Sequence, residues 1–356
     1  MRKSHNHFLN LAFEEAKINL GKTGSNPTVG CIVVKNNSVI NSGHTSLNGR
    51  PHAEFNALNS SRKITNSDLY VTLEPCTHYG LTPPCANLII KKKIKRVFFS
   101  DHDIDERSAK KLKLVLNKKN IKVIKYKNKN FSNFYEDYFL NRKKKIPYID
   151  GKIAVSRDYF TINKNSKWIT NEYSRKRAHF IRSNYNAIIS TSKSINKDNS
   201  LLNCRLEGFN SNKPDVIIID LKLKIKKNIK LFKTSHKRKI IIVTTVIKNK
   251  KKIFLKKKGI KFINIVNLSN TNDFKHLLKI LKTKGYNRIL VESGLTFLNE
   301  FIKRRLISNL YLFKTSLELR KKGCNNTSNL ILKKIGLKKQ INVNLKDDKL
   351  YKIRIK

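Results

Sequence analysis

The sequence predicts an α/β protein made of two domains. Its 356 residues exceed the length at which a single hydrophobic core stops growing. Short apolar runs typical of strands, such as CIVV, DLYVTL, KIIIVTT and RILVES, alternate with segments of helical spacing. The basic and weakly patterned LNRKKKIP at 140–147 separates two such series and is the expected linker. We therefore expect one domain over 1–145 and a second over 146–356.

The first series alternates helices and strands from its start. Residues 6–20 carry apolar side chains at helical spacing and end at Gly21, a suitable helix C-cap. TVGCIVV and SVINSG flank a turn-like KNN and predict a β-hairpin. The segment from HAE begins a helix, DLYVTL is a strand, and PPCANLIIKKK is a helix with prolines at its N-terminus. RVFFS, a helix near 108–117 and IKVIKY complete the unit.

The second series begins at Pro147 and has its own core. Its expected strands are YIDGKIAVS, NAIIS, DVIIID, KIIIVTT, RILVES and NLYLF. Its expected helices cover roughly 171–183, 272–284 and 296–305. This pattern predicts a second α/β domain.

The charge of the chain favours no specific nucleic-acid partner. Lys and Arg number 77 against 24 Asp and Glu, a formal net charge of +53. The surplus lysine is spread over nearly every segment and is accompanied by abundant asparagine and isoleucine, which share its A/T-rich codons. Codon bias explains all three residue types, whereas a nucleic-acid surface explains only lysine. A positive field would still attract anionic substrates.

The hydropathy pattern leads us to expect a cytoplasmic protein. No apolar run is long enough to span a membrane, and the N-terminus lacks the apolar segment of a signal peptide. Five cysteines do not form a disulfide framework, and Cys31 lies within an apolar run, as a buried structural thiol does. Only Cys76 and Cys85 stand among other residues that could ligate a metal.

His52, Cys76 and Cys85 form a candidate zinc site. Catalytic zinc takes three protein ligands at tetrahedral positions and leaves the fourth for water. Both cysteines precede or begin expected helices, whose N-termini lower thiol pKa values and favour the thiolate that zinc requires. Glu54, two residues after the histidine, is placed to act as a general acid and base without ligating the metal.

The spacing of these residues departs from one form of the zinc deaminase signature. H-x-E and P-C are present, but eight residues separate Cys76 from Cys85 where P-C-x-x-C has two. His78 lies two residues after Cys76, which suits substrate contact better than ligation of the same metal. The less favoured interpretation is that His52, Glu54 and the two cysteines are unrelated residues of the surface and the core that form no common site.

The motifs NPTVGCIVV, PHAEFNAL, YVTLEPCTHYGLTPPC and PYIDGKIAVSRD together resemble the bifunctional deaminase/reductase family of riboflavin biosynthesis, the RibD type. The resemblance covers the whole chain. It implies a cytidine-deaminase-like three-layer α/β/α domain followed by a dihydrofolate-reductase-like α/β domain, with one zinc ion in the first and NADPH in the second. It also implies a homo-oligomer, a small phosphorylated pyrimidine as substrate, and Asn26 and His78 as pocket residues.

The same resemblance assigns residues to the reductase. LVESGLTFLNE reads as a strand, a turn at Gly294 and a helix whose first amides can hold a cofactor phosphate. By resemblance, the cofactor-binding residues are Val155, Trp168, Ser194, Asp198, Gly294, Leu295, Thr296, Phe297, Leu298, Asn299 and Glu300. By resemblance, the substrate-binding residues are Lys152, Ser166, Arg182, Leu202, Arg205 and Glu292. Arginines suit a phosphate through bidentate hydrogen bonds.

Several positions depart from the family pattern. Tyr159 stands where the family has a glycine, Asp198-Asn199-Ser200 replaces DDP, and Gly294-Leu295-Thr296 replaces GPT. In the first domain, the DPNP loop is Asp103-Ile104-Asp105-Glu106.

The expected function is deamination of 2,5-diamino-6-(5-phosphoribosylamino)pyrimidin-4(3H)-one, followed by reduction of the ribosyl group to a ribityl chain. A deaminase with an impaired reductase domain is the first alternative. A nucleic-acid cytidine or adenosine deaminase is the second, and a non-enzymatic zinc-stabilised scaffold is the third.

Overall fold

The computed structural model describes residues 2–59, 63–127, 131, 133–209, 213–327 and 340–355. The chain divides into two compact units, Met1–Lys144 and Lys145–Lys356, each with its own sheet. No helix in these described ranges is both long and apolar enough to cross a membrane.

The first unit is built on a five-stranded sheet in the order β2-β1-β3-β4-β5. Strand β1 pairs antiparallel with β2 and β3, and the remaining neighbours are parallel. The strands are β1 (Gly30–Lys35), β2 (Ser38–His44), β3 (Asp68–Leu73), β4 (Arg96–Asp101) and β5 (Lys122–Lys125).

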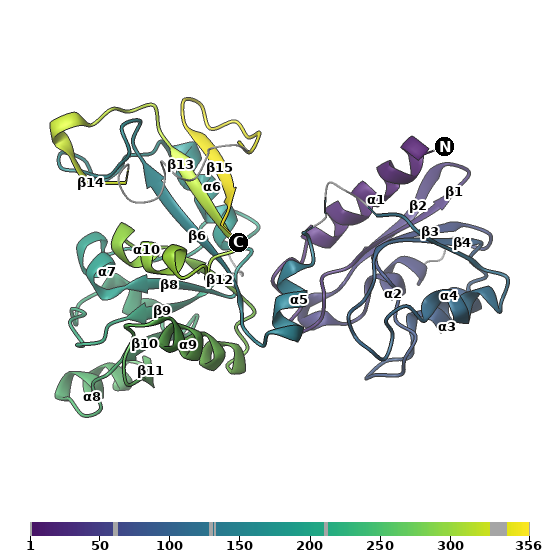
Figure 1. The fold of residues 1–356 in the computed structure, drawn as a ribbon, viewed down its shortest axis with the longest axis horizontal. Helices are drawn as coiled ribbons and strands as arrows, with labels where there is room; N and C mark the ends of the chain where they lie inside the picture. The colour runs from purple at the N-terminus through teal and green to yellow at the C-terminus, as the bar shows by residue number, and fades with distance from the viewer. Residues whose placement is uncertain are drawn as a thin grey trace. The chain divides into compact units, whose positions relative to one another are not determined.

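Helices cover both faces of this sheet, as Figure 1 shows. Ile32 and Val34 of β1 pack into the cluster that contains Leu9 and Ala12 of α1 (Arg2–Lys17). The alternate residues of β1 pack into the cluster that contains residues of α2, α3 and α4. These helices are α2 (Ala53–Leu58), α3 (Cys85–Lys91) and α4 (Leu112–Asn117), and a 3-10 turn covers Leu47–Gly49. The expected three-layer α/β/α arrangement is confirmed.

The expected linker at 140–147 is wrong over its first half. Residues 140–143 form the end of α5 (Glu136–Lys143), whose first turn is acidic and whose last turn is basic, an arrangement that suits the helix dipole. Tyr138 is buried in the core of the first unit. The burial of Tyr138 therefore stabilises a helix that continues into a segment whose lysines alone suggest a linker.

The second unit has an eight-stranded sheet in the order β11-β10-β9-β8-β12-β6-β13-β15. All neighbours are parallel except the terminal pair β13 and β15. The strands are β6 (Tyr148–Val155), β8 (Ala187–Thr191), β9 (Asp215–Ile219), β10 (Ile240–Thr244), β11 (Lys261–Asn264), β12 (Arg288–Val291), β13 (Asn309–Lys314) and β15 (Lys349–Arg354). A separate two-stranded sheet joins β7 (Phe160–Asn163) to β14 (Gly323–Asn326).

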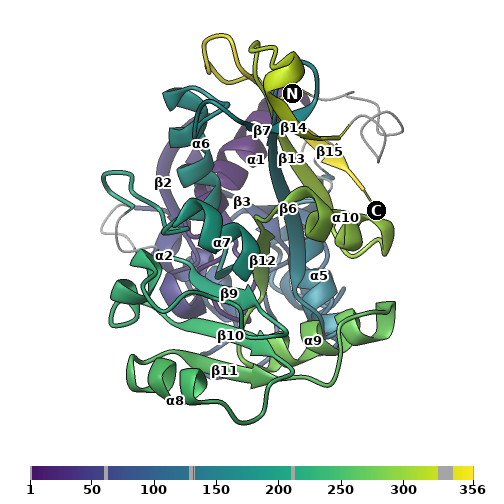
Figure 2. The same ribbon diagram turned by 90° about the vertical axis from the view of Figure 1, so that its left-hand side faces the viewer.

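Both faces of the large sheet are buried, as expected for strands that are apolar throughout. One face packs against α9 (Thr271–Thr283) and α10 (Leu295–Lys303). The other packs against α6 (Glu172–Arg182), α7 (Ser192–Asp198) and α8 (Lys250–Lys257), and Figure 2 shows α6 and α7 in front of the sheet. Short 3-10 segments cover Lys230–Thr234 and Arg320–Lys322. The parallel order brings the carboxyl ends of β6, β8 and β12 to one edge of the sheet.

Candidate active sites

The three predicted zinc ligands converge in the first unit. His52 is the N-cap residue of α2, Cys76 lies just after β3, and Cys85 is the first residue of α3. Their ligand atoms all lie within 4.8 Å of one another. Two helix N-termini and one strand end therefore hold the three side chains, which come from segments that are neighbours in the fold.

The donor set and its spacing fit zinc. His52 Nδ1 lies 3.4 Å from Cys85 Sγ and 3.7 Å from Cys76 Sγ. Tetrahedral zinc, with bonds of about 2.0 Å to nitrogen and about 2.3 Å to sulfur, requires ligand atoms roughly 3.5 Å apart. One histidine and two cysteines form a known ligand set of catalytic zinc, in which the fourth position is open.

Main-chain hydrogen bonds fix Cys76 against the start of α3. The amide of Cys85 donates to Cys76 Sγ at 3.3 Å, and the amide of Ala86 donates to the Cys76 carbonyl at 3.1 Å. The Cys85 thiol and the His52 ring also stabilise the Cys76 thiolate, so the pKa of Cys76 falls to about 4. The shared proton and burial raise the pKa of Cys85. The site thus favours the thiolate, the form of sulfur that a metal binds, at Cys76.

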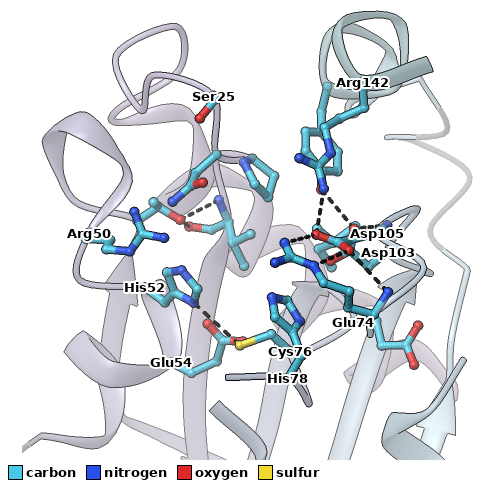
Figure 3. A pocket seen from close by; sticks show the side chains of 17 residues that line it. Ser25, Arg50, His52, Glu54, Glu74, Cys76, His78, Asp103, Asp105 and Arg142 are labelled. Carbon is cyan, nitrogen blue, oxygen red and sulfur yellow. Dashed lines mark hydrogen bonds and ion pairs between the residues drawn. The ribbon is translucent and has the colours of Figure 1, made fainter. Parts of the chain in front are cut away.

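Glu54 lies beside this ligand set in the first turn of α2 and is 3% exposed. Burial raises its pKa to about 7. Figure 3 shows its carboxylate next to His52 and Cys76. A carboxyl group with a pKa near neutrality can both accept and return a proton, which is the property that a general acid and base needs.

A pocket opens above the ligand set, and Asn26 and His78 line it (Figure 3). The Asn26 side-chain amide donates to the Gly49 carbonyl at 2.8 Å, which fixes its orientation. His78 Nδ1 lies 2.5 Å from Ser108 Oγ. Both predicted pocket residues are therefore on the wall of the zinc-type site.

The pocket also contains three arginines that sequence reasoning missed. Arg50, Arg107 and Arg142 line it together with Asp105 and other residues. In a chain with 77 Lys and Arg, no sequence signal distinguishes these three from solvent-exposed arginines.

A largely buried ion-pair network connects three of the predicted substrate residues of the second unit. Arg182 Nε and Nη2 donate to the two carboxylate oxygens of Glu292 at 2.8 and 2.7 Å, and Lys152 Nζ lies 3.3 Å from the same carboxylate. Burial alone would raise the pKa of Glu292, but Arg182 and Lys152 hold that pKa below its usual range. The network lies where β6 and β12 run side by side.

Arg205 lies on the same network but has no carboxylate partner among the described residues. Its Nη1 donates to Asn203 Oδ1 at 3.1 Å, and its Nη2 lies 3.2 Å from His179 Nε2. His179 Nδ1 donates to the Asn203 carbonyl at 2.7 Å, so its Nε2 is free to accept from Arg205. Burial and the adjacent Arg182 lower the pKa of His179 to about 4, which keeps the ring neutral.

The remaining predicted substrate residues lie in loops. Leu202 is buried with a φ of 47°, and its carbonyl accepts a hydrogen bond from Arg238 Nη1 at 2.8 Å. Ser166 Oγ bonds the main chain of Trp168, donating to its carbonyl at 3.1 Å. The structure gives neither residue an ion pair or hydrogen bond to the network around Glu292.

Two of the predicted cofactor-binding residues, Ser194 and Gly294, are in direct contact. The Gly294 amide donates to Ser194 Oγ at 3.1 Å, which joins α7 to the start of α10. Val155 is buried at the end of β6, whereas Trp168 is 53% exposed. Asp198 ends α7, and burial raises its pKa.

The predicted cofactor segment 294–300 forms the N-cap and the first turns of α10. Its main-chain amides, more than most of its side chains, are the groups that could bind a cofactor. No side chain caps its N-terminus, and its first turn carries no acidic residue. Leu298 lies in the core and Phe297 packs against it, while Glu300 pairs with Arg304. Asn299 is buried, and its Oδ1 has no hydrogen-bond partner in the described structure. The side chains of Phe297 and Leu298 therefore serve packing.

Comparisons with known proteins agree with this two-part architecture. Residues 2–101 match the cytidine and deoxycytidylate deaminase zinc-binding region, and residues 147–319 match the RibD C-terminal domain. The chain is 33% identical over 320 residues to the riboflavin biosynthesis protein RibD of Aquifex aeolicus, covering 88% of this chain and 87% of that protein. It is also 33% identical over 323 residues to RibD of Buchnera aphidicola subsp. Baizongia pistaciae, covering 86% and 85%.

Solved structures share the fold over nearly the entire chain. RibD of Acinetobacter baumannii superimposes with a TM-score of 0.81 at 24% identity, covering 99% of both chains. A diaminohydroxyphosphoribosylaminopyrimidine deaminase/5-amino-6-(5-phosphoribosylamino)uracil reductase of Thermotoga maritima gives 0.79 at 25% identity, also covering 99% of both. The chain therefore belongs to the RibD family of riboflavin biosynthesis, with a deaminase domain followed by a reductase domain.

Proposed function

We propose that the first unit hydrolyses the amino group of 2,5-diamino-6-(5-phosphoribosylamino)pyrimidin-4(3H)-one and that the second unit reduces the ribosyl group of the product. The product of the first reaction would be 5-amino-6-(5-phosphoribosylamino)uracil. Membership of the RibD family supports both steps. The observation that carries the proposal is the convergence of His52, Cys76 and Cys85 beside the buried Glu54.

His52, Cys76 and Cys85 would hold the zinc ion of the deaminase. When bound, zinc acts as a Lewis acid that makes water a usable nucleophile at neutral pH. Glu54 would accept one proton of the attacking water and pass it to the adjacent ring nitrogen as the C–O bond forms. It would then move the second proton, from the new hydroxyl group, to the amino nitrogen, so that the C–N bond breaks and a carbonyl and ammonia result. Its pKa of about 7 suits both halves of this transfer.

The pocket residues would orient the pyrimidine. The Asn26 side chain is held by the Gly49 carbonyl, and its oxygen accepts no hydrogen bond from the described part of the chain, so that it can accept one from the ring. His78, hydrogen-bonded to Ser108, faces the same pocket. These fixed groups hold the amine-bearing carbon toward Glu54, which converts binding into correct orientation for reaction.

The reductase unit would bind NADPH at the edge where β6, β8 and β12 end. The uncapped N-terminus of α10 suits a cofactor phosphate, because its N-cap residue, Gly294, has no side chain to occupy the first amides and no acidic residue of the first turn opposes an anion there. NADPH supplies the hydride. Ser194 fixes the position of Gly294, and Trp168, Val155 and Asp198 would complete the cofactor site.

Arg205 would bind the substrate phosphate in the second unit. Arg182 is neutralised by Glu292, but Arg205 keeps its charge without a carboxylate partner in the described structure. Lys152 and Glu292 would contact the sugar, where their paired donors and acceptors match hydroxyl groups.

Two assays on the purified protein test the proposal. The first measures zinc content and deamination of the diaminopyrimidine substrate. The second follows NADPH consumption with the deaminated product supplied directly. Deamination without NADPH oxidation would restrict the function to the first unit, and absence of both would contradict the proposal.

A further inference from the structure

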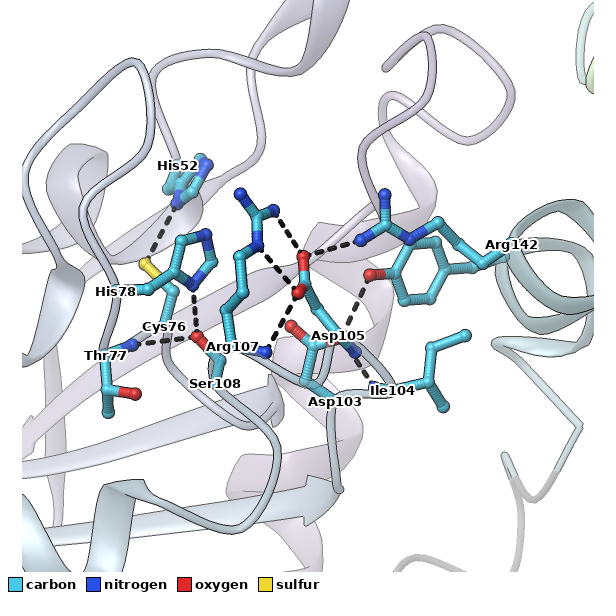
Figure 4. A network of polar contacts seen from close by, with 11 residues as sticks. His52, Cys76, Thr77, His78, Asp103, Ile104, Asp105, Arg107, Ser108 and Arg142 are labelled. Atoms are coloured by element: carbon cyan, nitrogen blue, oxygen red, sulfur yellow. Dashed lines mark hydrogen bonds and ion pairs between the residues drawn. The ribbon is translucent and has the colours of Figure 1, made fainter.

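The deaminase pocket contains a group of charges that the proposed chemistry does not use. Arg107 donates from Nε and Nη2 to the two carboxylate oxygens of Asp105 at 2.9 and 2.6 Å. Arg142, from α5, donates from Nη2 to the same carboxylate at 2.6 Å. Figure 4 shows both guanidinium groups meeting at Asp105, with the His78 ring on the other side of Arg107.

The other carboxylates near this group already have their own donors. Glu74 accepts from His102 Nδ1 at 2.8 Å and from the amides of Lys110 and Leu112 at 3.0 and 3.3 Å. Asp103 accepts from Tyr138 Oη at 2.9 Å and from two main-chain amides. One carboxylate therefore serves two guanidinium groups, and the Asp105–Arg107–Arg142 group has a net positive charge.

The two arginines retain unused donors. Arg107 Nη1, and Nε and Nη1 of Arg142, form no hydrogen bond with any residue that the structure describes. The side chains of Arg107 and Arg142 are 59% and 42% exposed, whereas that of Asp105 is 10% exposed. Their free edges are accessible to a ligand, while the buried carboxylate holds them in place.

Such an arrangement suits an oxyanion. A guanidinium group presents paired donors that match the geometry of phosphate, and two held in advance reduce the side-chain ordering that binding requires. Arg50 also lines the pocket, but Figure 3 places it on the side of His52, away from Asp105, and it has no ion pair in the described chain. The fixed pair is therefore the better phosphate site.

We propose that Arg107 and Arg142, held by Asp105, form the subsite that binds the phosphate of the deaminase substrate. This inference rests on the proposed deamination of a phosphoribosylamino pyrimidine. The amine-bearing carbon lies at the zinc ligands and the phosphate at the opposite end of the substrate, so one pocket recognises both ends. Asp105 is a positioning residue, since it acts through the arginines.

The test measures steady-state deamination of the phosphorylated substrate and of its dephosphorylated counterpart. Arg107→Gln and Arg142→Gln should each raise KM for the phosphorylated substrate about tenfold or more, with little change in kcat, because each removes a charged hydrogen bond. Their kcat/KM for the dephosphorylated compound should stay at the wild-type value. Arg107→Lys should lie between, since lysine keeps the charge but lacks the fork.

Arg96→Gln is the matched control. Arg96 also makes a bidentate ion pair, with Asp68 at 2.7 and 2.5 Å, but it does not line the pocket. Its loss should leave both KM values unchanged. Zinc content and the activity on the dephosphorylated compound report whether each variant is folded.

The outcomes separate the two proposals. If the wild-type protein fails to deaminate the phosphorylated pyrimidine, the proposed function is wrong. If it succeeds and the Arg107 and Arg142 variants match Arg96→Gln, the subsite is wrong. A larger KM increase in Arg50→Gln than in either of those variants would also overturn the subsite.

Discussion

The two units assemble their polar sites in different ways. The ligand set of the first unit comes from residues 52–85, where short motifs at two helix starts and one strand end supply every group. The network of the second unit joins residues as distant in sequence as Lys152 and Glu292, which meet because β6 and β12 are neighbours in the sheet. A local site is readable as a motif, whereas a dispersed site depends on the topology.

This contrast predicts that removal of one local ligand is enough to abolish metal binding and deamination at the first site. Cys85→Ala should abolish zinc binding and reduce deamination to background, because two ligands do not hold catalytic zinc. NADPH oxidation with the deaminated product should be unchanged. Metal analysis and both assays check this, with Cys31→Ala as the control that removes another buried thiol of the same unit. A zinc-loaded, active Cys85→Ala protein would break the assignment.

Glu54→Gln separates metal binding from proton transfer. It should lower kcat for deamination by about 10²–10⁴-fold while zinc remains bound, because general acid and base catalysis contributes about that factor. Glu15→Gln makes the same chemical change at a partly buried residue that bonds Ser42 and His44, away from the zinc-type site. Equal activity in the Glu54 and Glu15 variants would contradict the role of Glu54.

The stability of the second unit should depend on the ion pairs around Glu292. Glu292→Gln leaves Arg182 and Lys152, whose side chains are 13% and 17% exposed, without a carboxylate and should destabilise the second unit by at most about 3–5 kcal/mol. Urea unfolding of the full chain measures this, and deamination should persist until the first unit unfolds. Glu172→Gln, which removes an exposed i,i+4 pair with Lys176, should leave the stability nearly unchanged, because solvent screens exposed ion pairs.

His179 should make the second unit sensitive to acid. Its pKa is lowered to about 4 in the folded state from an ordinary value of 6.5, so below pH 6.5 the unfolded state binds the proton that the folded state does not. Stability is therefore fully present above pH 6.5 and falls as the pH drops toward 4, by about 2 kcal/mol between pH 7 and 5.

The matched measurement compares the wild-type protein with His179→Gln. Urea unfolding at pH 7 and pH 5 should show that the stability difference between the two proteins shrinks in acid by about that 2 kcal/mol. An unchanged difference would mean that the folded protein protonates His179 at pH 5 as readily as the unfolded chain does, so that its ring does not accept a hydrogen bond from Arg205 at that pH.

Much of the fold was predictable because apolar strands and helical spacing are local properties. The strands DVIIID and RILVES and the helix at 272–284 appear close to their predicted limits. β7 and β14 were not predicted, since FTIN and GCNN lack an alternating apolar pattern and pair only through the tertiary fold. Helix α8 (KKKIFLKK) was also missed, because its lysines hide the single buried Leu255 and the buried part of Lys252.

The site residues, too, were predictable where the signal is local in the sequence. His52, Glu54, Cys76 and Cys85 carry rare residue types at meaningful spacing, so sequence alone brings them together. His179 and Asn203 were missed because their function is to orient an arginine, and no spacing rule reports that role.

The hydrogen bonds at the base of the segment between Cys76 and Cys85 have an evolutionary consequence. The amides of Cys85 and Ala86, at the end of that segment, bond Cys76 at its start. The length of the segment is therefore uncoupled from the positions of the metal ligands. Lengthening a closed loop costs little free energy, which grows only with the logarithm of its length. Insertions here can therefore create new substrate preferences while the ancestral hydrolytic chemistry is inherited intact.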